Sequence, residues 1–369
     1  MKFKIDSENL RKGIFLVEGV ISSREIKSQL SNILFEVKKD ILTLSATDLE
    51  IAIRTSLKCE CEEEGEVTLP AKKISLIVKG FEEATIEIAS NPSQETIIID
   101  PYGKSHARYA ILGLPKTEFP TIPEIKSDGL VSFPNSLLLE MIRKTKYAVA
   151  VEDSRYVFNG LYLISSEKNL IVVATDGKRL SKIEREFPLE LKLDDGIIVP
   201  YKAIREIEHI LNPGSSSEMM LVGNQLFIRT DEAELMCNLI EGTYPDYKQV
   251  IPEEIGTMIK FSRQSLINSI KKMSTLANEQ TRLIKIHFEE EKIKITAYTA
   301  ELGESDDYIE CDYKGEPIEM GFNYNYFLDS LREIEEDELE IGLNEDMTPV
   351  VINNKKDEGF IGVVMPMRL

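Results

Sequence analysis

One β-rich stretch decides the fold, because three versions of it follow one another along the chain: LTLSATDLE at 42–50, LIVVATDGKRL at 170–180 and IKITAYTAE at 293–301. Each version is a run of apolar and β-branched residues that ends in small and polar ones, which is typical of a strand that enters a turn. Repetition at a nearly constant spacing indicates repeated structural units. We therefore expect three similar domains.

Two further landmarks recur in the same order. A short strand that ends in Phe and leads into a capped amphipathic helix begins each unit, with the phenylalanines at Phe3, Phe133 and Phe261, 130 and 128 residues apart. A strand that closes on Pro or Gly precedes a second helix at 67–81, 197–211 and 318–331. Three landmarks repeated in the same order indicate one motif used three times.

Each unit therefore reads as strand, helix, strands, helix, strands, with many short alternating runs rich in Val, Ile and Thr. This pattern predicts an α+β fold in which antiparallel sheet dominates. Proline residues at 120–123 and at 252 mark the predicted connections. We expect the three domains to cover residues 1–127, 128–256 and 257–369.

The composition is that of a folded globular protein, since 42% of the residues are hydrophobic. No apolar run approaches the ~18 residues that span a bilayer, and the start MKFKIDSENL lacks the apolar core of a signal peptide. The cysteines, Cys59, Cys61, Cys237 and Cys311, form no CxxC pair and no zinc-type spacing. We expect a soluble, cytoplasmic protein without metal or other cofactor.

The sequence lacks the usual signatures of catalysis. Its three histidines, His106, His209 and His287, stand beside no Ser or Cys nucleophile motif, and the chain has no Gly-rich phosphate loop. Asp48 and Asp176 stand at strand ends, where an aspartate usually accepts backbone hydrogen bonds in a turn. These patterns favour a binding protein over an enzyme.

Charge is distributed unevenly along the chain. The formal net charge is −20, yet the six predicted helical segments together carry +7, so −27 remains for strands and loops. Basic helix faces can contact DNA phosphates without reading the base sequence, although a basic helix face is also often merely solvated. The candidate DNA-contacting residues are Arg24, Lys27, Lys72, Lys73, Lys79, Arg143, Lys144, Lys146, Tyr156, Lys202, Arg205, Arg263, Lys271 and Lys272.

Several motifs are distributed along residues 1–369: ATDLE (46–50), RYVFNG (155–160), ATDGKRL (174–180), YPDY (244–247) and the terminus VVMPMRL (363–369). Together they resemble the beta subunit of bacterial DNA polymerase III, the family of beta sliding clamps. It implies three clamp domains per chain and a head-to-tail homodimer, closed into a ring with helices lining the hole and antiparallel sheets outside. It also implies a non-catalytic processivity factor that encircles duplex DNA without sequence preference.

The resemblance implies two protein-binding surfaces as well. DNA polymerases, the clamp loader and other replication and repair proteins would bind through a short peptide in a hydrophobic pocket formed by Phe158, Thr175, Gly177, Lys178, Arg179, Leu180, Pro245, Val250, Asn323, Tyr326, Pro349, Val363, Met365, Pro366, Met367, Arg368 and Leu369. The methionines at the chain end would make this surface adaptable to many partners. The dimer interface would join Arg108, Tyr109 and Ile111 to Thr275, Leu276, Glu304, Asp306 and Asp307.

Three residues depart from the family pattern. Ser28 stands where proline is common, Lys178 where histidine is common, and Gln249 at a place that can be basic. The last two bear on partner preference and leave the pocket in place. Two alternative functions stay open at this level: a scaffold that keeps the ring but is no longer loaded onto DNA, and a phosphoester-processing enzyme with a basic cleft.

Overall fold

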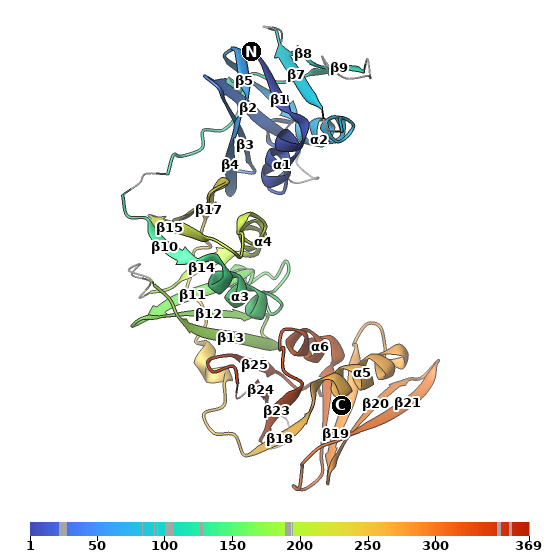
Figure 1. The fold of residues 1–369 in the computed structure, drawn as a ribbon. Coiled ribbons are helices and arrows are strands. Elements are labelled where there is room, and N and C mark those ends of the chain that lie inside the picture. The colour runs from blue at the N-terminus through green and yellow to red at the C-terminus, as the bar shows by residue number, and fades with distance from the viewer. Residues whose placement is uncertain are drawn as a thin grey trace. The chain divides into compact units, whose positions relative to one another are not determined.

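The structure is a computed structural model that describes residues 1–21, 28–82, 84–91, 93, 95–99, 107–125, 128–188, 193, 195–344, 348–353 and 356–368. The chain divides into two compact units (Figure 1). Unit 1 comprises residues 1–136 and 202–239, and unit 2 comprises residues 137–201 and 240–369.

The α-helices of the described residues lie where the sequence predicts them. Asp6 caps the first helix, because its Oδ1 accepts a hydrogen bond from the backbone N–H of Asn9 at 2.9 Å. Asn323 caps the last helix in a similar way, through the N–H of Asn325 at 3.0 Å. The helices are α1 (Ser7–Glu18), α2 (Ala71–Lys79), α3 (Asn135–Lys146), α4 (Tyr201–Ile210), α5 (Arg263–Met273) and α6 (Tyr324–Arg332).

Short 3-10 helices occur in the connections between these elements. They are η1 (Ser28–Ser31), η2 (Lys116–Glu118), η3 (Tyr156–Phe158), η4 (Tyr247–Val250) and η5 (Ser274–Leu276). Within the described ranges, no helix combines the length and the apolar character needed to cross a membrane.

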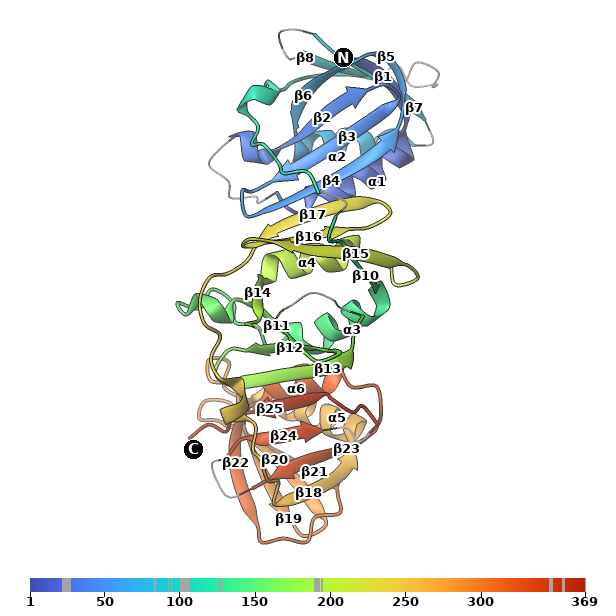
Figure 2. The same cartoon turned by 90° about the vertical axis from the view of Figure 1, so that its left-hand side faces the viewer.

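Unit 1 contains two antiparallel sheets (Figure 2). The five-stranded sheet has the order β5-β1-β7-β8-β9, with β1 (Lys2–Asp6), β5 (Glu60–Glu63), β7 (Thr85–Ser90), β8 (Glu95–Ile99) and β9 (Arg108–Leu112). The eight-stranded sheet has the order β10-β15-β16-β17-β4-β3-β2-β6, with β2 (Asn32–Lys38), β3 (Ile41–Thr47), β4 (Ile51–Lys58), β6 (Gly65–Pro70), β10 (Val131–Pro134), β15 (Ser216–Val222), β16 (Gln225–Arg229) and β17 (Ala233–Asn238).

Unit 2 repeats this arrangement with an eight-stranded and a four-stranded antiparallel sheet. The first has the order β14-β11-β12-β13-β25-β24-β23-β18, with β11 (Gly160–Ser166), β12 (Asn169–Thr175), β13 (Arg179–Glu186), β14 (Ile197–Pro200), β18 (Thr257–Ser262), β23 (Glu338–Leu343), β24 (Val350–Asn353) and β25 (Ile361–Val364). The second has the order β21-β20-β19-β22, with β19 (Leu283–Glu289), β20 (Lys292–Thr299), β21 (Gly303–Glu310) and β22 (Ile318–Asn323).

Each eight-stranded sheet combines strands from two sequence repeats. In unit 1, β4 pairs with β17, and Ala52 lies opposite Met236. In unit 2, β13 pairs with β25, and Leu180 lies opposite Val363. Each of these two ladders joins chain segments that are far apart in the sequence into the continuous sheet of its own unit.

The helices bury their apolar faces against these sheets. Helix α1 packs on β3 and β4 and beside α2, with Leu10 and Ile14 almost completely buried. Gly13 allows the close approach, since a Cβ there would fall 2.6 Å from a methyl carbon of Leu57. In unit 2, α5 packs on β20, β21 and α6 and buries Ile270. The cores therefore lie between helices and sheets, as the amphipathic patterns predict.

The predicted α+β organisation with predominantly antiparallel sheets is confirmed. The compact units cut the chain differently from the sequence repeats, because the middle repeat contributes strands to both eight-stranded sheets. The domain boundaries near residues 127 and 256 stay predictions, and residue 127 lies outside the described residues.

Candidate functional site

A tight turn between β12 and β13 forms the centre of the candidate site in unit 2. The hydroxyl of Thr175 accepts a hydrogen bond from the N–H of Gly177 at 3.0 Å and donates one to the carbonyl of Arg179 at 2.6 Å. The carboxylate of Asp176 accepts from the N–H groups of Lys178 and Arg179 at 2.9 and 3.0 Å. Gly177 has a φ of 81°, which glycine adopts without strain. The turn is therefore held by its own side chains.

Arg179 links this turn to helix α6. Its guanidinium is 3.1 Å from a carboxylate oxygen of Asp176 and 2.6 Å from one of Asp329. Its central carbon also lies 4.7 Å from the ring centre of Tyr326. Only 12% of the Arg179 side chain is exposed, so these charge-assisted hydrogen bonds are poorly screened by solvent. The guanidinium thereby joins the β12–β13 turn to α6.

The last residues of the chain form another side of the site. The N–H of Met365 donates to the carbonyl of Lys178 at 2.9 Å, and the N–H of Met367 donates to the carbonyl of Gly321 at 2.7 Å. Val363 is completely buried, whereas Met365, Pro366 and Met367 are half-buried. The backbone of the chain end is thus fixed while flexible thioether side chains remain accessible.

An apolar cluster of unit 2 lies beneath the site. Phe158, Leu180, Tyr244 and Val363 are buried in it together, and the ring centres of Phe158 and Tyr244 lie 6.1 Å apart. The segment 244–250 borders this cluster, with Pro245 exposed and Val250 36% exposed. Burial also raises the pKa of the Tyr244 hydroxyl, which stays neutral at physiological pH.

The predicted pocket residues come from separate stretches of unit 2. The turn supplies residues 175–180, the connection after residue 243 supplies Pro245 and Val250, the start of α6 supplies Asn323 and Tyr326, and Pro349 precedes β24, which pairs with β25. Arg368 is exposed at the chain end, and Leu369 lies outside the described residues. That these residues bind peptides stays a prediction.

Two residues that contact the candidate site, Arg155 and Asp329, are not among the site residues predicted from the sequence. Arg155 donates a hydrogen bond to the carbonyl of Asp176 at 3.3 Å, and its guanidinium carbon lies 4.3 Å from the Phe158 ring centre. It also bonds Asp153 and lowers the pKa of that carboxyl to about 2. The RYVFNG motif contains Arg155 and could have drawn attention to it, whereas nothing in the sequence marks Asp329.

The candidate DNA-contacting residues differ in their exposure. Lys146, Lys202 and Arg263 are half-buried, and Arg24 and Lys27 lie outside the described residues. Lys144 is only 8% exposed. The exposed ones are Lys72, Lys73, Lys79, Arg143, Tyr156, Arg205, Lys271 and Lys272.

Three of the candidate lysines are paired with carboxylates inside their own unit, the exposed Lys272 with Asp307 and two less exposed ones, Lys144 and Lys202. Lys144 of α3 pairs with Glu140 and Asp357, and Lys202 of α4 pairs with Asp48 and donates to the carbonyl of Val20 at 2.9 Å. Their charges are largely neutralised by these partners. Among the exposed candidates, Arg143 and Lys272 also meet carboxylates, but their side chains stay open to solvent. The whole set stays a prediction.

The predicted interface residues lie at or near two sheet edges. Strand β9 ends the five-stranded sheet of unit 1, and β21 ends the four-stranded sheet of unit 2. Edge strands offer unpaired backbone groups to a further strand. Arg108, Tyr109, Thr275, Glu304 and Asp306 are exposed, whereas Ile111, Leu276 and Asp307 are half-buried. Asp307 pairs with Lys272 at 3.2 Å, so it is already engaged within the chain.

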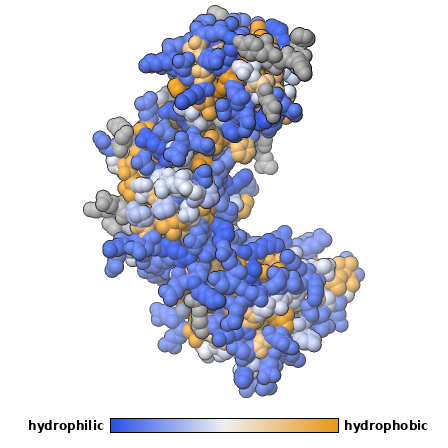
Figure 3. Space-filling model, in the orientation of Figure 1, coloured by the Kyte–Doolittle hydropathy of each residue, from blue (hydrophilic) through white to orange (hydrophobic). Residues whose placement is uncertain are grey.

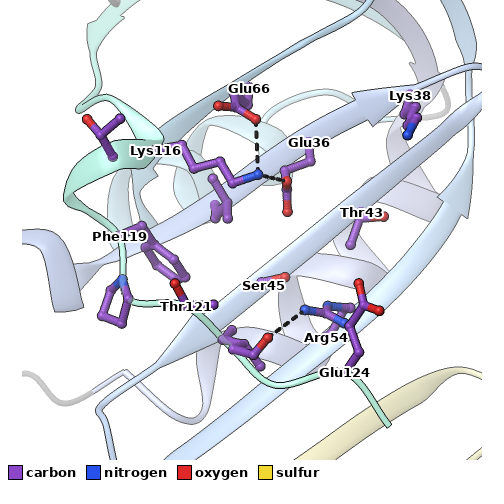
Figure 4. Close-up of a pocket in the computed structure, with 14 residues that line it drawn as sticks. Glu36, Lys38, Thr43, Ser45, Arg54, Glu66, Lys116, Phe119, Thr121 and Glu124 are labelled. Carbon is purple, nitrogen blue, oxygen red and sulfur yellow. Dashed lines mark hydrogen bonds and ion pairs between the residues drawn. The ribbon is translucent and has the colours of Figure 1, made fainter. Parts of the chain in front are cut away.

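Unit 1 has a pocket of about 620 Å³ on its eight-stranded sheet, beside the segment 116–124 (Figure 4). Lys116 reaches into it between Glu36 and Glu66, and its Nζ lies 2.5 Å from Oε1 of Glu36 and 3.1 Å from Oε2 of Glu66. Arg54 points toward the same segment and donates to the carbonyl of Ile122 at 3.4 Å. This pocket is therefore polar and partly filled by the chain's own ion pairs.

The remaining surface offers little sign of a chemical centre. Hydrophilic residues cover most of the face drawn in Figure 3, where hydrophobic residues form separate patches. In the part of the chain that the structure describes, no three His, Cys, Asp or Glu residues are grouped so that they could hold a metal ion. The apolar site on unit 2 is thus the best-supported functional surface.

Comparisons with known proteins give one consistent picture. Family models for the N-terminal, central and C-terminal domains of the DNA polymerase III beta subunit match residues 1–123, 132–246 and 248–368. The chain is 32% identical to the beta sliding clamp of Pseudomonas putida and 30% identical to that of Chlamydia muridarum, over its full length and 100% and 99% of theirs. It is similar to a crystal structure of the DNA polymerase III beta subunit from Pseudomonas aeruginosa, with a TM-score of 0.93, 30% identity and full coverage of both chains.

Proposed function

Because this chain belongs to the family of DNA polymerase III beta subunits, we propose that it is a sliding clamp, a non-catalytic processivity factor of DNA replication that holds polymerases on duplex DNA. The observation that carries the proposal is that all three family domains follow one another along the chain. The chain acts as a dimeric ring in the cytoplasm, and it encircles DNA instead of gripping it.

Charge explains why encirclement is needed. A protein with a net charge of −20 is repelled by DNA as a whole, and surface charges act over only about 8 Å at physiological salt. The exposed Lys72, Lys73, Lys79, Lys271 and Lys272 lie on α2 and α5, and helices that line the hole would bring such residues close to phosphates. Contacts of this kind are weak and sequence-independent, which permits sliding.

Ring closure is assigned to the sheet edges formed by β9 and β21. We propose that β9 of one protomer meets β21 of its partner, a head-to-tail contact that closes because it occurs twice. Tyr109, Ile111 and Leu276 supply apolar contacts, and Arg108 faces the acidic residues of β21. Exposed ion pairs contribute only about 0–1 kcal/mol. We therefore expect Leu276→Asp to give monomers in sedimentation, while Arg108→Ala stays dimeric; a fully dimeric Leu276→Asp protein would place the interface elsewhere.

The apolar site on unit 2 is proposed to bind the short peptides by which polymerases, the clamp loader and repair proteins attach. Such a peptide brings a glutamine and one or two large apolar side chains, each worth about 1.5–3 kcal/mol when buried. Ordering the peptide offsets part of this gain. We expect a dissociation constant of micromolar order, about −8 kcal/mol. The half-buried Met365 and Met367 can adapt to different partners.

Retention on circular DNA tests the function as a whole. The protein is loaded onto nicked circular DNA by a clamp loader, separated from free protein, and the circle is then cut. A ring predicts stable retention on the circle and rapid loss after linearisation with both ends free. Continued binding to the cut DNA would contradict encirclement, and failure to load at all would favour a scaffold that has kept the fold without the replication role.

A further inference from the structure

A second pocket of about 370 Å³ lies beside the candidate peptide site in unit 2. Its floor is formed by Tyr162 and Ile164 of β11 and Ile171 of β12, and its rim by residues 244–248. Ile164 lies opposite Ile171, and Thr175 lies opposite Leu180. Because side chains alternate between the faces of a strand, this floor and Leu180 lie on one face of the sheet. Pro245 borders both sites.

Aromatic rings connect the two sites without interruption. Phe158, in the peptide site, meets the ring of Tyr244 edge to face at 6.1 Å. Tyr244 stacks on Tyr162 with ring centres 4.6 Å apart and an interplanar angle of 2°, and Tyr247 meets Tyr162 edge to face at 6.4 Å. The candidate peptide site and the second pocket are thus bordered by one continuous aromatic row.

The second recess suits an aromatic side chain better than a charged one. Tyrosine rings present edges and faces to which a further ring packs favourably. The charged residues on the rim, Asp246 and Lys248, have opposite signs, so they offer no net attraction for a charged group. The corresponding pocket of unit 1 has Leu34, Glu36 and Thr43 in its sheet floor and Lys116 reaching into it, which leaves the aromatic recess as a feature of unit 2.

We propose that this recess is an extension of the peptide site, and that it takes an aromatic side chain flanking the apolar anchors of a partner peptide. The inference rests on the proposed function, because it assumes that the neighbouring site binds partner peptides. It assigns Tyr162, Ile164 and Tyr247 a role in partner selection. Partners with an aromatic residue within a few positions of their anchors gain affinity here, and partners without one bind through the anchors alone.

The chain contains no tryptophan, so a tryptophan in a peptide is a unique fluorescent probe. The probes are synthetic peptides with one glutamine and two leucine anchors, extended by two to five residues at the amino or the carboxyl end. The outermost residue of each extension is tryptophan or, in the control, glycine. We expect one series of tryptophan peptides to show blue-shifted emission on binding and about two- to tenfold tighter binding than its glycine control.

Variants of the recess then locate the effect. Tyr162→Ala removes the stacked ring and should abolish the gain from tryptophan, whereas Tyr162→Phe keeps the ring and should preserve it. Ile164→Glu serves as a second variant in case Tyr162→Ala fails to fold, which its melting curve reveals. Each variant is therefore measured with both the tryptophan and the glycine peptides, and the ratio of the two affinities is compared, because Tyr162 and Ile164 also pack against the cluster beneath the peptide site.

Two results would overturn the inference. The first is tryptophan emission that stays solvent-like in every extension while the unextended peptide binds, and the second is an affinity gain that survives both Tyr162→Ala and Ile164→Glu. Failure of the unextended peptide itself to bind would instead contradict the proposed peptide site. The two hypotheses are thereby separated.

Discussion

The turn at residues 47–51 in unit 1 and the turn at residues 175–179 in unit 2 have the same hydrogen bonds but different surroundings. In unit 1 the hydroxyl of Thr47 accepts from the N–H of Leu49 and donates to the carbonyl of Ile51, at 3.0 and 2.8 Å, and Asp48 accepts from the N–H of Ile51 at 2.8 Å. Leu49 even has the same φ, 81°, as Gly177. The two turns therefore have the same backbone conformation although their residues differ.

The strands that pair beside the two turns differ in chemistry. The N–H of Asn238 donates to the carbonyl of Glu50 at 2.8 Å, in the way that the N–H of Met365 donates to Lys178. The side chain of Asn238 is polar, and its amide group donates a hydrogen bond to the carbonyl of Leu49 at 3.2 Å. Met365 is apolar, and like Asn238 it is half-buried. The same ladder position thus carries a polar side chain that bonds its own turn in unit 1 and an apolar side chain in unit 2.

The comparison teaches that the repeated fold does not by itself create a binding site. In unit 1 the matching sheet face is covered by the connection that carries Ile122, Ile125 and Leu130, which pack on buried residues such as Met236 and Ala52. In unit 2, Val363 stands at the position of Met236 and Leu180 at the position of Ala52. Methionines follow Val363 along the chain. A few different side chains on the same backbone thus distinguish a covered sheet face in unit 1 from the candidate peptide site in unit 2.

Deletion of Met365–Leu369 should have the largest effect on this difference. It removes one side of the peptide site and little of the core, since Val363 and Val364 remain. We expect calorimetry to detect no binding of a polymerase-derived peptide, while sedimentation still shows the dimer. The matched change in unit 1, Asn238→Ala, should leave peptide binding unaltered. Undiminished affinity of the truncated protein would mean that partners bind elsewhere.

Exchange of the residues at the positive-φ position should have opposite effects in the two units. Gly177→Leu should lower the free energy of unfolding by about 1–2 kcal/mol, and its Cβ would fall 3.2 Å from a guanidinium nitrogen of Arg155. Leu49→Gly relieves strain at a half-exposed side chain and should raise that free energy by up to about 1 kcal/mol. Denaturant unfolding measures both. Changes of the same sign would show that the two turns are not energetically equivalent.

Loss of the carboxylate at Asp329 should have a smaller effect, confined to unit 2. Asp329→Asn weakens the hold on Arg179 and so loosens the packing of its guanidinium on Tyr326. Partly exposed ion pairs contribute up to about 1 kcal/mol, so we expect peptide affinity to fall about two- to fivefold. The comparison variant is Lys202→Met, which breaks the pair with Asp48 in unit 1 and should not change peptide binding. Equal losses in both variants would indicate a general structural effect.

The smallest effect is expected for the ion pairs that Glu140 makes with Arg185 and Lys144 in unit 2, which acid should weaken. Burial raises the pKa of Glu140, but hydrogen bonds from Arg185 and Lys144 outweigh burial and hold it below its ordinary value of 4.5. Its contribution is therefore complete at neutral pH and is lost as the pH falls below 4.5 through the lowered pKa. We expect Glu140→Gln to reduce the melting temperature at pH 7 and to reduce it less at pH 3. The corresponding loss of unfolding free energy at pH 7 should be below about 1 kcal/mol. A larger loss at pH 3 would contradict this assignment.

Local patterns in the sequence predicted much of this structure. The helices, the antiparallel strands and the capped turns after Thr47 and Thr175 all depend on residues near one another in the chain. Helix periodicity, strand alternation and aspartate in a turn are local effects, so they can be recognised without knowledge of the rest of the fold. The terminal motif likewise marked the chain end as a candidate binding surface before its position was known.

Long-range pairing could not be predicted in the same way. The sequence repeats are three, yet β4 pairs with β17 and β13 with β25, which produces two compact units. Tertiary packing also buried Lys144 against Asp357, although its helix position alone suggested a contact with DNA. Asp357 lies 213 residues further along the chain than Lys144, so this pairing could not be recognised from the neighbourhood of the lysine.

The division between sequence and tertiary structure arises from these physical differences. The sequence by itself determined the family, the three repeats, the helices and the residues of the candidate peptide site, because each depends on local order or on a motif. Only the tertiary structure decided which lysines are neutralised, that Asp329 and Arg155 support the site, and that Tyr162, Tyr244 and Tyr247 form one aromatic row. Those features exist only after distant strands have paired, since the energy of a contact depends on distance in space and not along the chain.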